Sequence, residues 1–113
     1  MKKILISFVI PVLNEIDNVS RTLTLLKSRF PNSETIVVDG GSSDGTDEIA
    51  KSECDLFLRS SPGRAMQMDL GASFAKGEYL IFLHADTVPE FDEEEFSEQL
   101  LFSTIWGFFR LHL

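Results

Sequence analysis

Short apolar runs alternate with longer stretches of helical pattern along most of the chain. Residues 4–10 are almost all apolar and rich in branched side chains, which is typical of a parallel strand covered on both faces. Further short strands, rich in branched or aromatic residues, are predicted at 35–38, 55–58 and 79–83. The chain therefore offers four strands in its first three quarters, each separated from the next by enough residues for a helix.

The segments between these strands predict helices. After the first strand, apolar residues recur every three or four positions, as on the buried face of a helix. This stripe consists of Ile16, Val19, Leu23, Leu26 and Phe30. The residues expected to face water are Asn18, Arg21, Thr22 and Lys27. A second helix begins near Thr46 or Asp47. A third covers 64–76, with Gly71 as either a close-packing point or a weak spot. Its predicted inward stripe is Ala65, Met68, Ala72 and Ala75.

Strands that alternate with helices predict an α/β fold, with a mainly parallel sheet, right-handed crossovers and helices on both faces. The last quarter differs, because an acidic helix is expected at 91–102 and an apolar strand at 105–113. We find no internal repeat and no linker, so 1–113 is interpreted as a single domain. An uncovered apolar strand is prone to aggregate, which favours the interpretation that the chain is a fragment or a truncated product.

Charge and cysteine content narrow the classes of partner and compartment. The 113 residues contain 10 Lys and Arg against 18 Asp and Glu, which argues against a nucleic-acid binder. Six of the acids lie between Glu90 and Glu98, so the acidity is local. The single cysteine allows no intrachain disulfide and favours a reducing compartment. Lys2 and Lys3 before the apolar run imitate a signal peptide, but Pro11 interrupts the run and no cleavage site follows. We therefore expect a cytoplasmic protein.

Polar clusters follow three of the predicted strands. Residues 11–15 follow the first strand, 39–46 the second and 84–86 the fourth. Because ligands bind outside the carboxyl ends of the strands in an open parallel sheet, we expect these clusters to converge on one crevice. The first loop has no G-x-G-x-x-G, and nothing in the chain matches G-x-x-x-x-G-K-[ST]. This argues against a dinucleotide oxidoreductase and a P-loop NTPase.

The chemistry of two of these clusters suits a nucleotide. The second combines glycines and hydroxyls with two carboxylates, Asp39 and Asp44, which can accept hydrogen bonds from a base N–H or a ribose hydroxyl. For Asp39 we favour ligand contact, whereas for Asp44 a role as helix N-cap is an equal alternative. His84 and Asp86 are two candidate metal ligands, and a divalent ion there could neutralise a diphosphate. The alternative is a structural histidine followed by a simple turn.

Three motifs in this order resemble the family 2 glycosyltransferases of the GT-A fold. They are VIPVLNE at 9–15, VVDGGSSDGT at 37–46 and FLHADT at 82–87. GRAMQMDLGA at 63–72 and the Trp106-Gly107 pair further resemble a bacterial subgroup known as rSAM/selenodomain-associated transferase 2. The resemblance covers essentially the whole chain. It implies metal-assisted transfer of a sugar from a nucleoside-diphosphate sugar to an acceptor hydroxyl, with inversion.

The resemblance also implies roles for individual residues. The implied nucleotide-sugar-binding residues are Pro11, Asn14, Glu15, Asp39, Ser42, Asp44, Arg64, Ala85 and Asp86. Within this set, Asp39 would meet the base and Arg64 the phosphates or ribose. Asp86 occupies the second aspartate of the D-x-D motif and would bind Mg²⁺ or Mn²⁺. His84 stands where the first aspartate usually is; as a second metal ligand, its imidazole would favour Mn²⁺.

By the same resemblance, 1–89 is the nucleotide-sugar-binding half and 90–113 the start of an acceptor half. The general base is expected downstream of the chain, because the carboxylates of residues 92–95 are better interpreted as a solvated helix face. The implied partners are a UDP-sugar, as the commonest choice, and a hydroxyl acceptor such as a lipid or glycan. A homo-oligomer and a peripheral position at the inner face of the membrane stay open. The alternative function is a truncated, catalytically inactive nucleotide-binding remnant.

Overall fold

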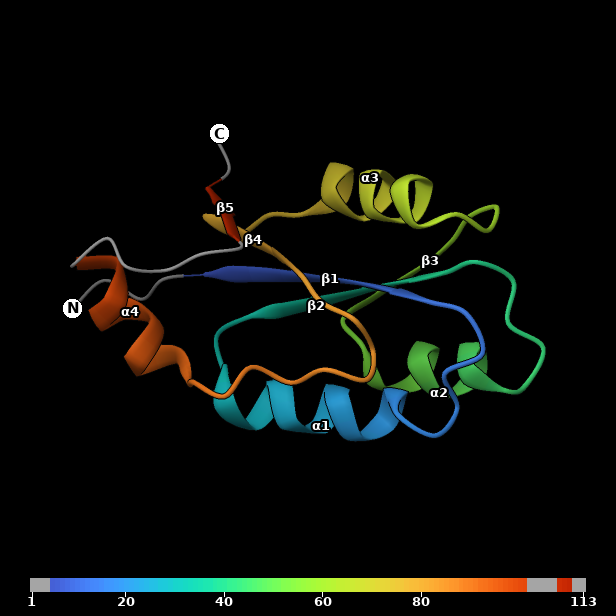
Figure 1. The fold of residues 1–113 in the computed structure, drawn as a ribbon, viewed down its shortest axis with the longest axis horizontal. Coiled ribbons are helices and arrows are strands. Elements are labelled where there is room, and N and C mark those ends of the chain that lie inside the picture. Colours follow the sequence, from blue (N-terminus) through green and yellow to red (C-terminus); the bar gives the residue numbers. More distant parts are fainter. Residues whose placement is uncertain (1–4, 102–107, 111–113) are drawn as a thin grey trace.

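The computed structural model describes residues 5–101 and 108–110, and these form an α/β fold around one five-stranded sheet (Figure 1). The strands are β1 (Ile6–Val12), β2 (Glu34–Asp39), β3 (Leu56–Arg59), β4 (Tyr79–Phe82) and β5 (Phe108–Arg110). The helices are α1 (Val19–Arg29), α2 (Thr46–Glu53), α3 (Arg64–Phe74) and α4 (Glu93–Leu101). The strand order is β3-β2-β1-β4-β5, with the first four strands parallel and β5 antiparallel to β4.

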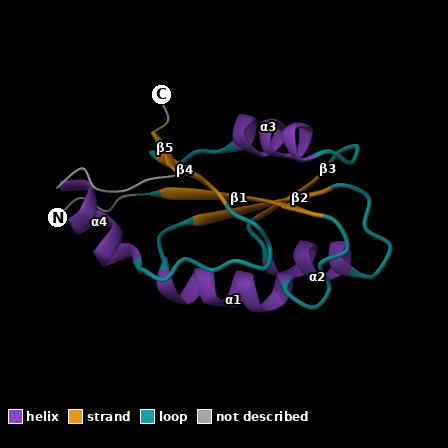
Figure 2. Ribbon diagram, in the orientation of Figure 1, coloured by secondary structure: helices purple, strands orange, loops and turns teal. Residues whose placement is uncertain are grey.

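The helices cover both faces of the sheet, as the alternating pattern predicted. Figure 2 shows α1 and α2 on one face and α3 on the other. Part of the predicted strand 105–113, the Trp106-Gly107 pair and the lysines near the N-terminus lie outside the described residues. No helix within the described ranges is long and apolar enough to cross a membrane.

The register of the strands explains how the loop after β4 reaches the loop after β1. Val12 of β1 lies opposite Asp39 of β2, so these two strands end level with each other. In contrast, Phe82, the last residue of β4, lies opposite Val9. The backbone N–H of Leu83 still donates to the Val9 carbonyl, at 3.0 Å. The chain therefore leaves β4 alongside the last residues of β1, which brings residues 84–86 next to the loop after β1.

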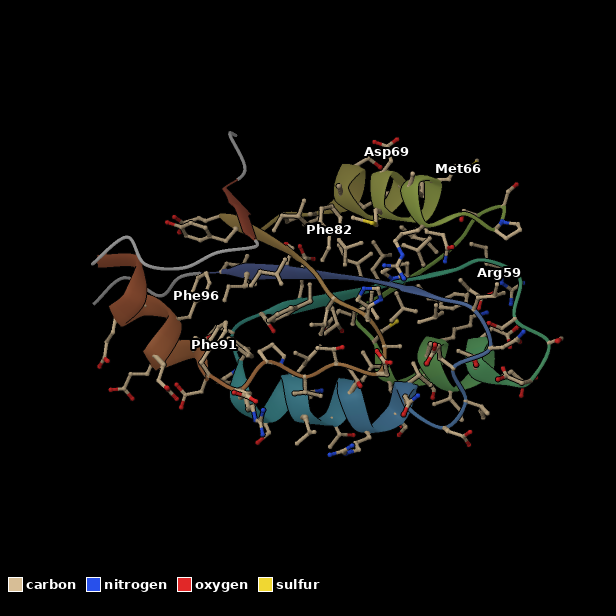
Figure 3. The ribbon with its side chains drawn as sticks, viewed as in Figure 1. Arg59, Met66, Asp69, Phe82, Phe91 and Phe96 are labelled. Carbon is tan, nitrogen blue, oxygen red and sulfur yellow. The ribbon has the colours of Figure 1, made fainter. Side chains whose placement is uncertain are left out.

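The main core lies between the sheet and α1, and aromatic rings extend it to α4. The rings of Phe8 and Phe30 meet edge to face with centroids 4.9 Å apart, and Phe91 packs on Phe30 at 6.0 Å. Phe91 and Phe96 stack on each other, and Figure 3 shows both between the first turn of α4 and the sheet. Edge-to-face and offset ring pairs add to the stabilisation that comes from buried area. One core of aromatic rings therefore connects β1 with α4.

A smaller core lies under α3, where Gly71 allows a close approach. A Cβ atom at this position would lie 2.4 Å from Cγ1 of Val9 and 3.1 Å from Cγ2 of Val38. Gly71 is therefore a close-packing point, one of the two predicted alternatives. The opposite side of α3 faces water, and Figure 3 shows Met66 and Asp69 directed away from the sheet.

Two expected orientations are wrong. Thr22 was expected to face water but is buried, because its hydroxyl donates to the carbonyl of Ala85 and is satisfied there. Ala65 was expected on the inward stripe of α3 but is exposed, while Gln67 and Gly71 are the buried residues of that helix. A polar residue can take this inward position because backbone carbonyls at the strand ends accept its hydrogen bonds.

Candidate functional site

The loops after β1 and β2 are tied together by side-chain hydrogen bonds. Oδ1 of Asn14 accepts from the N–H of Ser43 at 2.8 Å, and Oγ of Ser42 accepts from the N–H of Asn14 at 2.9 Å. The Thr46 hydroxyl accepts from the N–H of Glu15 at 2.8 Å. Asn14 itself has φ 53, a left-handed conformation that asparagine tolerates better than most residues. Several predicted site residues therefore hold the two loops against each other.

Asp44 belongs to this loop contact as well. Its Oδ1 accepts from the N–H and the hydroxyl of Thr46, at 3.0 and 2.5 Å, and its Oδ2 accepts from the N–H of Ile16 at 3.2 Å. The hydrogen bond from the Thr46 hydroxyl is the main reason why the pKa of Asp44 is lowered from 3.8. The helix begins at Thr46, as predicted, but the alternative of Asp44 as its N-cap is wrong, because Gly45, with φ 97, takes that position. Asp44 instead stabilises the turn one residue earlier.

Asp39 is the buried carboxylate of the site. Its side chain is 2% exposed, and Oδ2 accepts from the N–H groups of Gly41 and Ser42, both at 3.0 Å. Its Oδ1 is buried and has no hydrogen-bond partner. A buried carboxylate oxygen without a partner destabilises the fold, so such an atom in a native protein calls for an explanation. A donor group on a ligand is the explanation that the position of Asp39, at the carboxyl end of β2, favours.

Gln67 is a site residue that the sequence reasoning missed. It is 4% exposed, and its Nε2 donates to the carbonyls of Val12 and Val38, at 3.0 and 2.8 Å. Its Oε1 accepts from the N–H of Gly63 at 3.3 Å. A Cβ at Gly40 would lie 3.0 Å from Cδ of Gln67, so a larger residue there would press on the Gln67 carboxamide. Gln67 thus fastens the start of α3 to the ends of β1 and β2.

A cleft of about 410 Å³ lies at the carboxyl ends of the strands. Its lining comes from the loop after β1, the start of α3 and the turn after β4. The lining residues are Pro11, Val12, Leu13, Glu15, Gly63, Arg64, Gln67, His84, Ala85 and Asp86. The predicted convergence is therefore found for the loops after β1 and β4, which meet the start of α3. The second loop is joined to the first through hydrogen bonds and does not line the cleft.

A second cavity lies away from the carboxyl ends of the strands. It has a volume of about 510 Å³ and lies over α1 and α2, lined by Leu23, Thr24, Lys27, Ser28, Ser52 and Glu53. It contains no residue of the predicted polar clusters, so we place the candidate site in the cleft instead. The acidic run at residues 92–95 does not line the cleft either. Glu93 accepts hydrogen bonds from Asn32, and Glu94 and Glu95 are exposed.

The turn after β4 presents alternate side chains to the cleft. Ala85 is buried, and its carbonyl accepts from the hydroxyl of Thr22. His84 and Asp86, on either side, are exposed. The N–H of Thr87 donates to the carbonyl of His84 at 3.0 Å, which closes the turn. The backbone of this turn is thus anchored from the side of α1, while its two polar side chains lie exposed at the cleft.

Arg64 and His84 face each other across the cleft lining. Nη1 of Arg64 lies 2.8 Å from Nε2 of His84, and Nη2 lies 3.0 Å from Nδ1. Both side chains are exposed. No group of three or more His, Cys, Asp and Glu side chains that could hold a metal is present among residues 5–101 and 108–110. The protein ligands for a cation in the described part of the cleft are therefore few, and one of the two predicted ones already contacts a guanidinium.

Comparison with known proteins identifies the family. A sequence model of glycosyl transferase family 2 matches residues 7–97. The chain belongs to glycosyl transferase family 2. It is 36% identical over 94 residues to poly-β-1,6-N-acetyl-D-glucosamine synthase of Staphylococcus epidermidis, which covers 77% of this chain and 23% of the synthase. The chain spans about a quarter to a third of the length of the curated relatives it matches.

Solved structures agree on the fold of this family 2 chain. The mannosyltransferase PcManGT from Pyrobaculum calidifontis, solved in complex with GDP-Man and Mn²⁺, superposes with a TM-score of 0.73 at 17% identity. That likeness covers 94% of this chain and 34% of PcManGT. Residues 1–349 of TarS from S. aureus, in complex with UDP, give a TM-score of 0.67 at 18% identity, over 90% of this chain and 32% of that one. The predicted α/β GT-A fold is confirmed.

Proposed function

We propose that the chain provides the donor-binding part of a family 2 glycosyltransferase, which transfers a sugar from a nucleoside diphosphate to an acceptor hydroxyl with inversion. The observation that carries this proposal is the buried, unpartnered Oδ1 of Asp39 at the end of β2. A nucleobase N–H would supply the missing donor. The family membership and the cleft at the carboxyl ends of the strands support the same conclusion.

The state of Asp39 favours uridine as the nucleoside. Only Oδ1 is available, because Oδ2 already accepts from two backbone N–H groups. Uracil offers a single N–H, flanked by two carbonyls, which one carboxylate oxygen can satisfy. Guanine offers an N–H and an adjacent amino group, which a carboxylate would bind best with both oxygens free. TarS was solved with UDP and PcManGT with GDP-Man, so both nucleotides occur among proteins of this fold.

The cleft itself, at Arg64 and the turn after β4, is proposed to bind the diphosphate. Arg64 lines the cleft at the start of α3, and a guanidinium suits the paired oxygens of a phosphate. Asp86 is the proposed protein carboxylate for a divalent cation, and such a cation would neutralise negative charge on the diphosphate. Charge builds on the diphosphate as the glycosidic bond breaks, so Arg64 accelerates the reaction if it binds the leaving group more tightly in the transition state.

The remaining predicted residues take supporting roles in this proposal. Pro11 and Glu15 line the cleft, and Ala85 forms its floor between the two exposed side chains of the turn. Asn14, Ser42 and Asp44 hold the loops around the nucleoside end. The acceptor is proposed to be a hydroxyl on a glycan or a lipid. Nothing in the comparisons favours the alternative of a catalytically inactive remnant over a transferase.

The test is calorimetric titration of the purified chain with UDP, comparing the wild type with Asp39→Asn. Asparagine keeps an oxygen for the N–H groups of Gly41 and Ser42 but turns a donor toward the base. A hydrogen bond to a charged group contributes about 1.5–3 kcal/mol, so we expect UDP affinity to fall roughly tenfold to a hundredfold. Asp47→Asn is the matched control, because the Asp47 carboxylate already pairs with Arg59 at 3.2 Å and, unlike that of Asp39, has no buried oxygen without a partner. Its UDP affinity should equal that of the wild type.

GDP serves as the comparison ligand, and the wild type should bind it more weakly than UDP. Equal UDP affinity for Asp39→Asn and Asp47→Asn would contradict the role of Asp39. No saturable binding of either nucleotide by a folded wild type would contradict the proposed function itself.

A further inference from the structure

We infer that His84 is a positioning residue for Arg64 and not a ligand of the cation, so that part of the affinity for a diphosphate does not require a metal. This inference rests on the proposed function, since it concerns the phosphate end of the same cleft. It replaces the expectation that His84 and Asp86 together bind the metal. The contact between Arg64 and His84 carries the argument.

Each ring nitrogen of His84 lies within hydrogen-bond distance of Arg64. A neutral imidazole has one nitrogen with a free lone pair, and that nitrogen is the atom that ligates a metal. Nε2 lies 2.8 Å from one guanidinium nitrogen of Arg64, and Nδ1 lies 3.0 Å from the other. The ring nitrogen that lacks a proton can accept a hydrogen bond from the guanidinium nitrogen beside it, whereas the protonated ring nitrogen cannot accept one. Metal ligation by His84 would break this hydrogen bond and place a dication beside a guanidinium.

The other candidate ligands do not complete a metal site without His84. Asp86 is exposed and its Oδ1 accepts from the Thr87 hydroxyl at 3.2 Å. In the described part of the chain no third acidic, histidine or cysteine side chain joins this pair. A cation at Asp86 would therefore depend on oxygens of the diphosphate itself. The residues present fit a cation held jointly by one carboxylate and the nucleotide, and do not fit one held by His84.

A histidine at position 84 affects the charge of Arg64 differently from a carboxylate at the same position. A carboxylate at this position would form an ion pair with the guanidinium and neutralise it toward a phosphate. A neutral imidazole accepts one hydrogen bond and leaves the positive charge of Arg64 available. That hydrogen bond uses one N–H of the guanidinium, and the remaining donors can reach phosphate oxygens. His84 therefore orients the guanidinium without cancelling its charge.

Both partners of this contact stand on anchored backbone. The N–H of Gly63, directly before Arg64, donates to Oε1 of the buried Gln67. The carbonyl of Ala85, directly after His84, accepts from the buried Thr22 hydroxyl. The contact thus joins the start of α3 to the turn after β4 within one cleft lining. Such an arrangement presents an ordered cation to an anionic ligand before the ligand arrives, which reduces the entropy lost on binding.

The experiment separates UDP binding from metal binding in variants of the 113-residue chain. UDP is titrated by calorimetry in the presence of EDTA, and Mn²⁺ binding to the UDP complex is measured by electron paramagnetic resonance. His84→Ala should weaken metal-free UDP binding by about fivefold, the size expected for the loss of one ordinary hydrogen bond at an exposed site. His84→Gln should restore most of that loss, because its carboxamide oxygen can accept from Arg64. His84→Ala should leave the Mn²⁺ affinity of the UDP complex within about twofold of wild type.

Two further variants give the opposite pattern. Asp86→Ala should lose Mn²⁺ affinity while keeping metal-free UDP binding. His84→Asp should weaken UDP binding in EDTA, because the new carboxylate neutralises Arg64, and should strengthen Mn²⁺ binding. A loss of Mn²⁺ affinity in His84→Ala as large as that in Asp86→Ala would overturn the inference.

Unchanged UDP binding in EDTA for His84→Ala would overturn it as well, and most clearly if Arg64→Ala weakens that binding. Failure of the proposed function gives a different result. In that case the wild type binds UDP neither in EDTA nor with Mn²⁺. Exposed side chains tolerate substitution well, so these variants should fold like the wild type.

Discussion

The two parts of the proposed donor site are built from different kinds of residue. At the proposed nucleoside end, Asp39 and Gln67 are almost fully buried, and their polar atoms bond to the backbone of the strand ends and the loops. At the phosphate end, Arg64, His84 and Asp86 are exposed, and only the backbone that carries them is anchored. The side chains of the first part are fixed by the hydrogen bonds that form when the chain folds. The exposed side chains of the second part can still change conformation when a ligand binds.

Because of this difference, substitutions in the two parts should affect different properties of the protein. A buried polar group that loses its partner destabilises the fold by its desolvation free energy, whereas an exposed one returns to water at little cost. Substitutions at the nucleoside end should therefore change the free energy of unfolding, and substitutions at the phosphate end should change ligand binding alone.

The largest effect is expected for Gln67→Leu. Leucine leaves the carbonyls of Val12 and Val38 without their donor in a buried place, which should lower the free energy of unfolding by about 3 kcal/mol. Urea denaturation measures this value. Arg64→Leu, three residues earlier on the exposed side of the same helix, is the control and should change it by less than about 0.5 kcal/mol. Equal losses for the two variants would contradict the contrast between the ends.

The next effect concerns the close packing of α3 on the sheet. Alanine usually favours a helix over glycine by about 1 kcal/mol, yet Gly71→Ala would place a Cβ 2.4 Å from Cγ1 of Val9. We expect a net loss of about 1–3 kcal/mol in thermal or urea unfolding because the core is overpacked. Ser73→Ala, on the exposed side of the same helix, should stay near the wild type. A stabilised Gly71→Ala variant would show that α3 lies farther from β1 than described.

Thr22→Val tests the anchor beneath the phosphate end. Valine has nearly the same shape but cannot donate to the carbonyl of Ala85, so the free energy of unfolding should fall by about 1 kcal/mol. UDP binding should weaken as well, because the turn that carries His84 and Asp86 loses its tether. Thr24→Val is the matched control, since Thr24 is exposed on the same helix. If Thr24→Val weakened UDP binding as much as Thr22→Val, the proposed role of the Thr22 hydrogen bond in ligand binding would be contradicted.

The smallest effect is a dependence of stability on pH through Asp44. Hydrogen bonding to Thr46 lowers the pKa of Asp44 in the folded state from 3.8. A carboxylate with a lowered folded-state pKa stabilises the fold above its unfolded pKa, and this stabilisation is lost as the pH falls through the folded-state value. The difference in urea midpoint between the wild type and Asp44→Asn should therefore be constant above about pH 5 and shrink below 3.8. A difference that grows toward acid would contradict this sign.

The strands and helices followed from sequence pattern because periodicity records which side chains meet the core. The order of the clusters along the chain was enough to bring residues 11–15 and 84–86 together, since parallel strands end at one edge of the sheet. Gln67 escaped this reasoning because an amphipathic pattern treats a polar residue as outward-facing. Its spacing of four residues from both Gly63 and Gly71 was the available signal.

Contacts between side chains of distant segments could not be predicted. The buried Thr22 depends on a carbonyl 63 residues away, and the contact of Arg64 with His84 joins a helix start to a separate turn. Hydrogen bonding of Asn14 and Asp44 between the two loops likewise depends on how closely those loops approach. Each of these contacts is set by the three-dimensional path of the backbone, which local pattern does not contain.

The most direct test of the central claim is a pair of ¹H–¹⁵N NMR titrations of the wild type, one with uridine and one with UDP in EDTA. Uridine should shift the backbone signals of Asp39, Gly40 and Gly41 at the nucleoside end and leave the other end unchanged. UDP should shift the same signals and, in addition, those of Arg64 and His84. If UDP moved neither set in a folded chain, or moved only signals over α1 and α2, the assignment of the cleft as a donor site would be contradicted.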